Sequence, residues 1–91
     1  MIIYTDKSGK TETLTNEDLI ATKNSIYFTS LYTQGGKFRC VDQFGDYTIC
    51  ILDVIDDKYV INAFDNWNIC EDFDDTLTIE QLVTFITEGG Y

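Results

Sequence analysis

The sequence contains no histidine and no proline, and it has only six lysine and arginine residues against sixteen aspartate and glutamate residues. Without histidine, a serine or cysteine nucleophile lacks its commonest base, and the usual zinc-binding spacings are absent. Without proline or a low-complexity segment, nothing indicates a linker between domains. In a chain of 91 residues a second hydrophobic core would bury too little surface. We therefore expect one domain, residues 1–91.

Cysteine is also scarce. Cys40, Cys50 and Cys70 are three in number, and no Cys-x-x-Cys motif is present. An odd number of isolated cysteines favours free, partly buried thiols in a reducing compartment. The first residues show no signal-peptide pattern, and no apolar run approaches the length of a membrane span. The sequence thus predicts a soluble, cytoplasmic protein.

Apolar residues nevertheless make up 44% of the chain, enough for a core without disulfides or metals. Alternation of apolar and polar residues predicts a four-stranded antiparallel meander over residues 25–64. A short hairpin with Ser8 and Gly9 in its turn is expected before the meander. The expected strands are residues 1–6, 11–14, 25–32, 37–44, 47–55 and 58–64.

Two helices are indicated by their capping residues. Thr15 with Asp18 fits the start of a short helix that ends near Lys23. Thr78 with Gln81 forms a capping box for a second helix, which has a single apolar stripe. The stripe consists of Ile79, Leu82, Val83 and Ile86. The expected fold class is α+β, a four- to five-stranded antiparallel sheet (a meander) with the C-terminal amphipathic helix packed on one face and a short N-terminal helix.

The charge is placed unevenly along the chain. Residues 1–41 hold four acidic and five basic residues, whereas residues 42–91 hold twelve acidic residues against Lys58 alone. A negative field of this kind repels nucleic acid and anionic membranes, and it attracts basic protein surfaces or metal cations. A charged surface that only keeps the protein soluble is the other interpretation.

The segment 68–81, NICEDFDDTLTIEQ, concentrates this acidity and is expected to be the loop between the last strand and the second helix. A calcium EF-hand loop is excluded, because a loop that starts at Asp72 has Leu77 where glycine is needed and Val83 where glutamate is needed. A weak magnesium site at Asp72 and Asp74 stays open. No nucleophile elbow and no phosphate-binding loop occurs in the chain. We therefore expect a protein that is not an enzyme and has no cofactor, no catalytic residue and no metal site.

Mimicry of a polyanion is the functional interpretation of the acidic segment. Side chains two residues apart on a strand are roughly 6.6 Å apart, about two of the ~3.4 Å phosphate steps along one nucleic-acid strand. Trp67 with Phe73 would serve as an aromatic contact if exposed, although a lone Trp near a sheet edge is more often half-buried. The candidate partner-binding residues are Asp56, Asp57, Asp65, Trp67, Glu71, Asp72, Phe73, Asp74 and Asp75. Asp42, Asp46 and Asp53 are placed near the same rim.

In size and charge the chain resembles the short acidic inhibitors that phages and mobile elements encode against CRISPR or restriction machinery. The resemblance implies a non-enzymatic DNA mimic in the host cytoplasm, which occupies a basic surface of a nuclease or another nucleic-acid-handling enzyme. It implies no direct contact with nucleic acid or membrane. An immunity protein against a toxic nuclease would have the same size and charge.

Two other classes of function stay open. A structural or regulatory homo-oligomer, such as a homodimer, would form by strand addition at residues 1–6 or through exposed aromatic residues. A small metal-binding domain or enzyme would hold a divalent ion near Asp72. The first alternative predicts that the acidic segment is irrelevant to assembly, and the second predicts stabilisation by a divalent cation.

Overall fold

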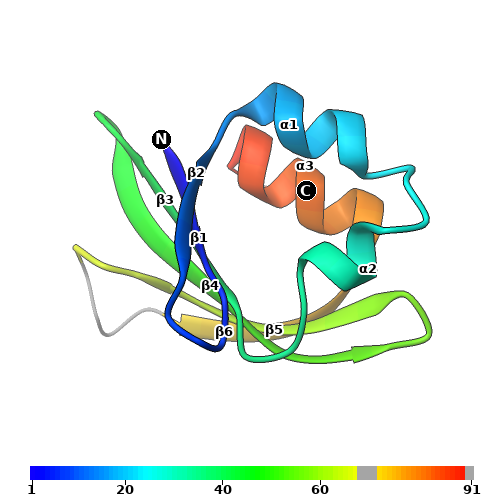
Figure 1. Ribbon diagram of the computed structural model, residues 1–91. Coiled ribbons are helices and arrows are strands. Elements are labelled where there is room, and N and C mark those ends of the chain that lie inside the picture. The colour runs from blue at the N-terminus through cyan, green and yellow to red at the C-terminus, as the bar shows by residue number, and fades with distance from the viewer. Residues whose placement is uncertain (68–71, 90–91) are drawn as a thin grey trace.

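The computed structural model describes residues 1–67 and 72–89, which form an α+β fold with one antiparallel sheet and three helices (Figure 1). The six strands are ordered β2-β1-β3-β4-β5-β6 across the sheet. The strands are β1 (Ile2–Thr5), β2 (Thr11–Leu14), β3 (Lys37–Asp42), β4 (Gly45–Ile55), β5 (Lys58–Asp65) and β6 (Asp72–Thr78). The helices are α1 (Asn16–Thr22), α2 (Phe28–Leu31) and α3 (Ile79–Glu88). The α+β class is confirmed, and the expected strand count of four to five is too low.

The N-terminal hairpin and both predicted caps are confirmed. The turn between β1 and β2 has Gly9 at φ 91°, and the Asp6 carboxylate accepts the backbone N–H groups of Ser8 and Lys10. Thr15 caps α1 as part of a capping box, and Thr78 caps α3 in the same way. Hydrogen bonds from nearby side chains are therefore sufficient to form the hairpin turn and to begin α1 and α3.

The strand predicted over residues 25–32 is wrong, because this segment is a turn followed by the short helix α2. Its alternating aromatic residues favour a strand by propensity alone. In the structure Phe28 and Tyr32 are instead buried on one side of a helical turn, with ring centroids 4.9 Å apart. The Tyr59 hydroxyl donates to the Tyr32 carbonyl over 2.5 Å and ties the end of α2 to β5. Tertiary packing of aromatic rings therefore decides the conformation here.

The loop predicted before α3 is also wrong, because residues from Asp72 onward form strand β6. Aspartate disfavours strands on average. Here β6 pairs with β5 along its whole length, from Phe64 opposite Asp72 to Lys58 opposite Thr78. Burial of Leu77 and the ladder of backbone hydrogen bonds outweigh the local preference.

All three helices cover the same face of the sheet, which curls around them (Figure 1). The predicted packing of the C-terminal helix on one face is confirmed, since α3 contacts β5, β6 and α1. Residues of both layers form the core, and its largest fully buried side chains are Tyr59, Phe28, Phe38, Leu19, Ile49, Ile61, Leu77, Leu82 and Val83. No described helix covers the other face of the sheet, so the outward side chains of β3 to β6 meet solvent or one another.

Gly36 gives a first test of this packing. A Cβ at Gly36 would overlap the Tyr4 ring, whereas a Cβ at Gly45 would meet nothing. We expect Gly36→Ala to lower the free energy of unfolding by about 1–3 kcal/mol, because the Tyr4 ring must leave its place in the core. Urea denaturation of both variants measures this, with Gly45→Ala as the matched control. Equal stability of the two variants would contradict the close approach of Tyr4.

The turn between β4 and β5 gives a second test. Asp56 and Asp57 have φ of 50° and 65°, a left-handed conformation that glycine adopts without cost. We expect Asp57→Gly to raise the free energy of unfolding by up to about 1 kcal/mol. Asp57→Ala removes the same carboxylate but keeps a Cβ, so it should not stabilise. Thermal unfolding of the two variants separates backbone strain from loss of charge.

Candidate functional site

The acidic strand β6 is an outermost strand of the sheet, and its side chains are divided between two faces. Leu77 is buried beneath the helices, so the alternation of a strand puts Phe73 and Asp75 on the helix side as well. Asp72 and Asp74 are exposed and belong to the opposite, helix-free face. The predicted pair of carboxylates two residues apart on a strand is therefore present, but Asp72, Asp74 and Asp75 do not all lie on one face.

The carboxylates of β6 are positioned by short-range hydrogen bonds. Asp74 accepts a hydrogen bond of 2.9 Å from the side-chain amide of Asn62, its neighbour on β5. Asp75 accepts the backbone N–H of Thr76 over 2.7 Å. Glu71 and Cys70, both considered from the sequence, lie outside the described residues.

The described candidate acidic residues outside β6 lie at two opposite ends of the sheet. Asp56 and Asp57 form the turn that precedes β5, whereas Asp65 is the last residue of β5. Seven residue steps at about 3.4 Å per step separate Lys58 from Asp65, or roughly 24 Å. These residues therefore do not share one rim, and only some of them can lie beside β6. Asp53 lies near Asp56 and Asp57 at one end of the sheet, and Asp42 lies near Asp65 at the other end.

We call the second group the acidic end of the sheet, defined by Asp42, Asp65 and Asp72 together with two exposed aromatic residues, Phe44 and Trp67. Trp67 is 64% exposed, so it does not belong to the core, and Asp65 accepts its backbone N–H over 2.8 Å. Phe44 in the β3–β4 turn is 83% exposed. The backbone bond from Asn66 N–H to the Asp46 carbonyl, 2.7 Å long, brings the segment after β5 beside this turn.

Sequence reasoning missed Phe44. The available signal was a phenylalanine inside the turn segment Asp42-Gln43-Phe44-Gly45, where polar residues are usual. The turn between β3 and β4 lies outside the core, so the Phe44 ring is exposed to solvent. Asp42 accepts the N–H groups of Phe44 and Gly45 and holds this turn closed.

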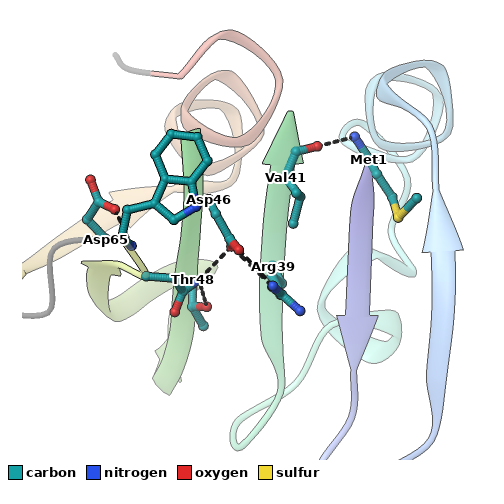
Figure 2. Close-up of polar contacts among 8 residues, drawn as sticks. Met1, Arg39, Val41, Asp46, Thr48 and Asp65 are labelled. Atoms are coloured by element: carbon teal, nitrogen blue, oxygen red, sulfur yellow. Dashed lines mark hydrogen bonds and ion pairs between the residues drawn. The ribbon is translucent and has the colours of Figure 1, made fainter. Parts of the chain in front are cut away.

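Asp46 also differs from its expected role, because it is buried and paired with Arg39 on the helix-free face (Figure 2). Arg39 donates to both carboxylate oxygens, from Nη2 over 2.7 Å and from Nε over 3.1 Å. Asn66 adds bonds to Asp46 and to Thr48. The hydrogen bonds from Arg39 and Asn66 lower the pKa of Asp46, and Asp46 in turn raises the pKa of Arg39. This carboxylate is therefore neutralised within the chain and unavailable to a partner.

The described cysteines have little nucleophilic character. Cys40 and Cys50 are free thiols, as predicted. Burial raises the pKa of Cys40 to about 11, and it also raises the pKa of Cys50. A thiol with a raised pKa carries little thiolate at neutral pH, so neither group is suited to nucleophilic chemistry.

Metal ligands and membrane-spanning helices were the other features considered for the described part of the chain. Among residues 1–67 and 72–89, no group of three or more cysteine, aspartate or glutamate side chains is arranged to hold a metal ion. No helix within these residues is long and apolar enough to cross a membrane.

The Arg39–Asp46 pair predicts a specific pH dependence of stability. Because the pKa of Asp46 is lowered in the folded state, its contribution is complete above the unfolded value of about 3.9 and is lost as pH falls through the folded value. We expect Asp46→Asn to be less stable than the wild type at pH 7, with a gap that narrows below about pH 4. Urea denaturation across pH 2–7 checks this, with Asp72→Asn as the control for an exposed carboxylate. A gap independent of pH would contradict the ion pair.

The site therefore consists of an outermost acidic strand, an acidic end with two exposed aromatic rings, and an internally neutralised Asp46. Asp56 and Asp57 are separate from it.

Comparison of the chain with protein-family models, with curated proteins and with solved structures gives no match.

Proposed function

We propose that this chain is a small binding protein, not an enzyme, which docks on a basic surface of another protein through β6 and the acidic end of the sheet. One observation carries the proposal. Asp72 and Asp74 project from the same exposed face of an outermost strand, and the exposed Trp67 lies in the segment between that strand and β5. A net charge of −10 attracts a basic partner from a distance and orients it during approach.

The partner we propose is a nuclease or another nucleic-acid-handling enzyme, whose nucleic-acid groove the chain occupies as a DNA mimic. The outward carboxylates of Asp72 and Asp74 are two residues apart on a strand, a separation of roughly 6.6 Å, about twice the ~3.4 Å step between phosphates. A groove lined by lysine and arginine would meet these carboxylates in place of two phosphates. Size and acidity are those of phage- or mobile-element-type inhibitors, including anti-CRISPR and anti-restriction proteins, and an immunity protein would use the same surface.

Aromatic contacts would add to the electrostatic attraction. Trp67 is 64% exposed and Phe73 is 43% exposed, and aromatic residues carry much of the binding energy in protein interfaces. Phe73 and the carboxylates of Asp72 and Asp74 lie on opposite faces of β6, so a partner would cover both kinds of group by wrapping around this outermost strand. Charge steers the approach, and ring burial slows dissociation.

Homo-oligomerisation is the second candidate, favoured by the outermost strand β2. Strand addition at residues 1–6 is excluded, because β1 pairs with β2 on one side and with β3 on the other. β2 carries one charged residue, Glu12, whereas β6 carries three carboxylates that oppose pairing with a second copy. Self-association would therefore proceed through β2, and sedimentation at increasing concentration would show a dimer that a proline at Thr13 abolishes.

The binding proposal predicts a position-specific effect of charge. We expect wild-type protein to capture a nucleic-acid-handling enzyme from host lysate at low salt, and duplex DNA to displace that enzyme. Asp72→Asn with Asp74→Asn should abolish capture, because two carboxylates on the binding face are lost. The fold should persist, since an asparagine at position 74 still accepts the hydrogen bond from Asn62. Capture and competition are quantified by mass spectrometry.

The matched control is Asp56→Asn with Asp57→Asn, which removes the same charge at the far end of β5. This control should retain capture. Equal loss in both double variants would show that only net charge matters. Capture that survives DNA competition, or that persists in Asp72→Asn with Asp74→Asn, would reject the mimic.

A further inference from the structure

A small cavity that we call the aromatic slot lies between the last turn of α3 and the neighbouring ends of β5 and β6. Its volume is about 240 Å³, and its lining includes Tyr47, Asp65, Asp72, Phe73, Phe85 and Gly89. Sites for drug-sized ligands usually measure about 300–1,000 Å³. The slot therefore suits a single side chain better than a small-molecule substrate.

Three aromatic rings form a continuous wall of the slot. The Phe85 ring lies 5.5 Å from that of Phe73 and 5.8 Å from that of Tyr47, measured between centroids. The Tyr47 hydroxyl donates to the Phe85 carbonyl over 3.2 Å, which fixes the last turn of α3 against β4. Phe73 remains 43% exposed, so part of this wall is accessible from solvent.

The surroundings of the slot are negative. The C-terminal end of a helix carries partial negative charge and favours a cation, yet the last turn of α3 contains no basic residue and ends at Glu88. Asp65, which strand alternation puts on the helix side with Ala63, adds a carboxylate to the lining, and none of the chain's six lysine and arginine residues belongs to it. An aromatic wall with this charge offers cation–π and ionic contacts to one positive group.

We propose that the aromatic slot receives one arginine side chain from the basic surface of the partner. This inference rests on the proposed function and names the residue that the partner inserts. A guanidinium is planar, weakly hydrated and stacks on aromatic faces, whereas the ammonium of lysine is compact and strongly hydrated. Its methylene stem would lie along the Phe73 and Phe85 rings, with the charge near Asp65 and the end of α3.

Blocked amino acids test the slot without any partner. The probes are the N-acetyl, N-methylamide derivatives of arginine, lysine and citrulline, and citrulline has the shape of arginine without its charge. Titrations of isotope-labelled full-length protein are followed by NMR at the rings of Phe73 and Phe85 and at the Gly89 amide. Arginine should bind roughly five- to tenfold more tightly than citrulline, and lysine should lie between them.

Two single-carboxylate variants locate the contact. Asp65→Asn should weaken arginine binding several-fold, because Asp65 lines the slot and strand alternation puts its side chain on the helix side. Asp56→Asn changes the net charge equally beyond the far end of β5 and outside the lining, so it should leave arginine binding unchanged. Phe73→Leu should reduce the preference for arginine over lysine, since the exposed ring is lost.

Each outcome of these titrations decides the inference. Equal shifts with arginine and citrulline, shifts centred away from α3, or equal effects of Asp65→Asn and Asp56→Asn would overturn it. If arginine binds the slot but no nucleic-acid enzyme is captured, the proposed partner is wrong and the slot stands. If the enzyme is captured and the slot does not take arginine, the proposed function stands and this inference fails.

Discussion

The backbone pairing between β5 and β6 is the interaction on which the candidate binding surfaces depend. It makes the acidic segment a strand, and a strand sends successive side chains to opposite faces. Asp72 and Asp74 therefore reach the helix-free face, while Phe73 turns toward Phe85 on α3. One ladder of hydrogen bonds thus produces both an exposed acidic row and one wall of the aromatic slot.

Charge in this protein is arranged by the sheet as well as by composition. The Arg39–Asp46 pair neutralises one carboxylate inside the helix-free face, with Asn66 and Thr48 completing the cluster. By contrast, Asp56 and Asp57 are exposed at one end of β5, and Asp72 and Asp74 are exposed along β6. Exposed and unneutralised carboxylates interact with approaching charges, whereas a buried pair mainly positions the strands around it. The negative charge of the acidic end therefore results from the positions at which β3 and β5 end and β6 begins.

Predictions from sequence succeeded where the physics is local. The hairpin at Gly9 and the capping boxes at Thr15 and Thr78 depend on residues within four positions of one another. The predictions failed over residues 25–32 and over β6, where distant contacts outweigh propensity. Tyr32 packs against Tyr4 and accepts a bond from Tyr59, and neither partner is near it in sequence. Trp67, expected to be half-buried, is instead 64% exposed.

The sequence by itself determined the α+β class, the ends of the longest helix, and the concentration of negative charge in residues 42–91. These properties follow from composition, from the 3.6-residue period of a helix and from capping hydrogen bonds. Only the tertiary structure decided that Asp46 is neutralised, that Asp56 and Asp57 lie far from Asp65, and that aromatic rings of β4, β6 and α3 form a slot. Each of these depends on strand order and register, which arise from long-range pairing and burial rather than from any short stretch of residues.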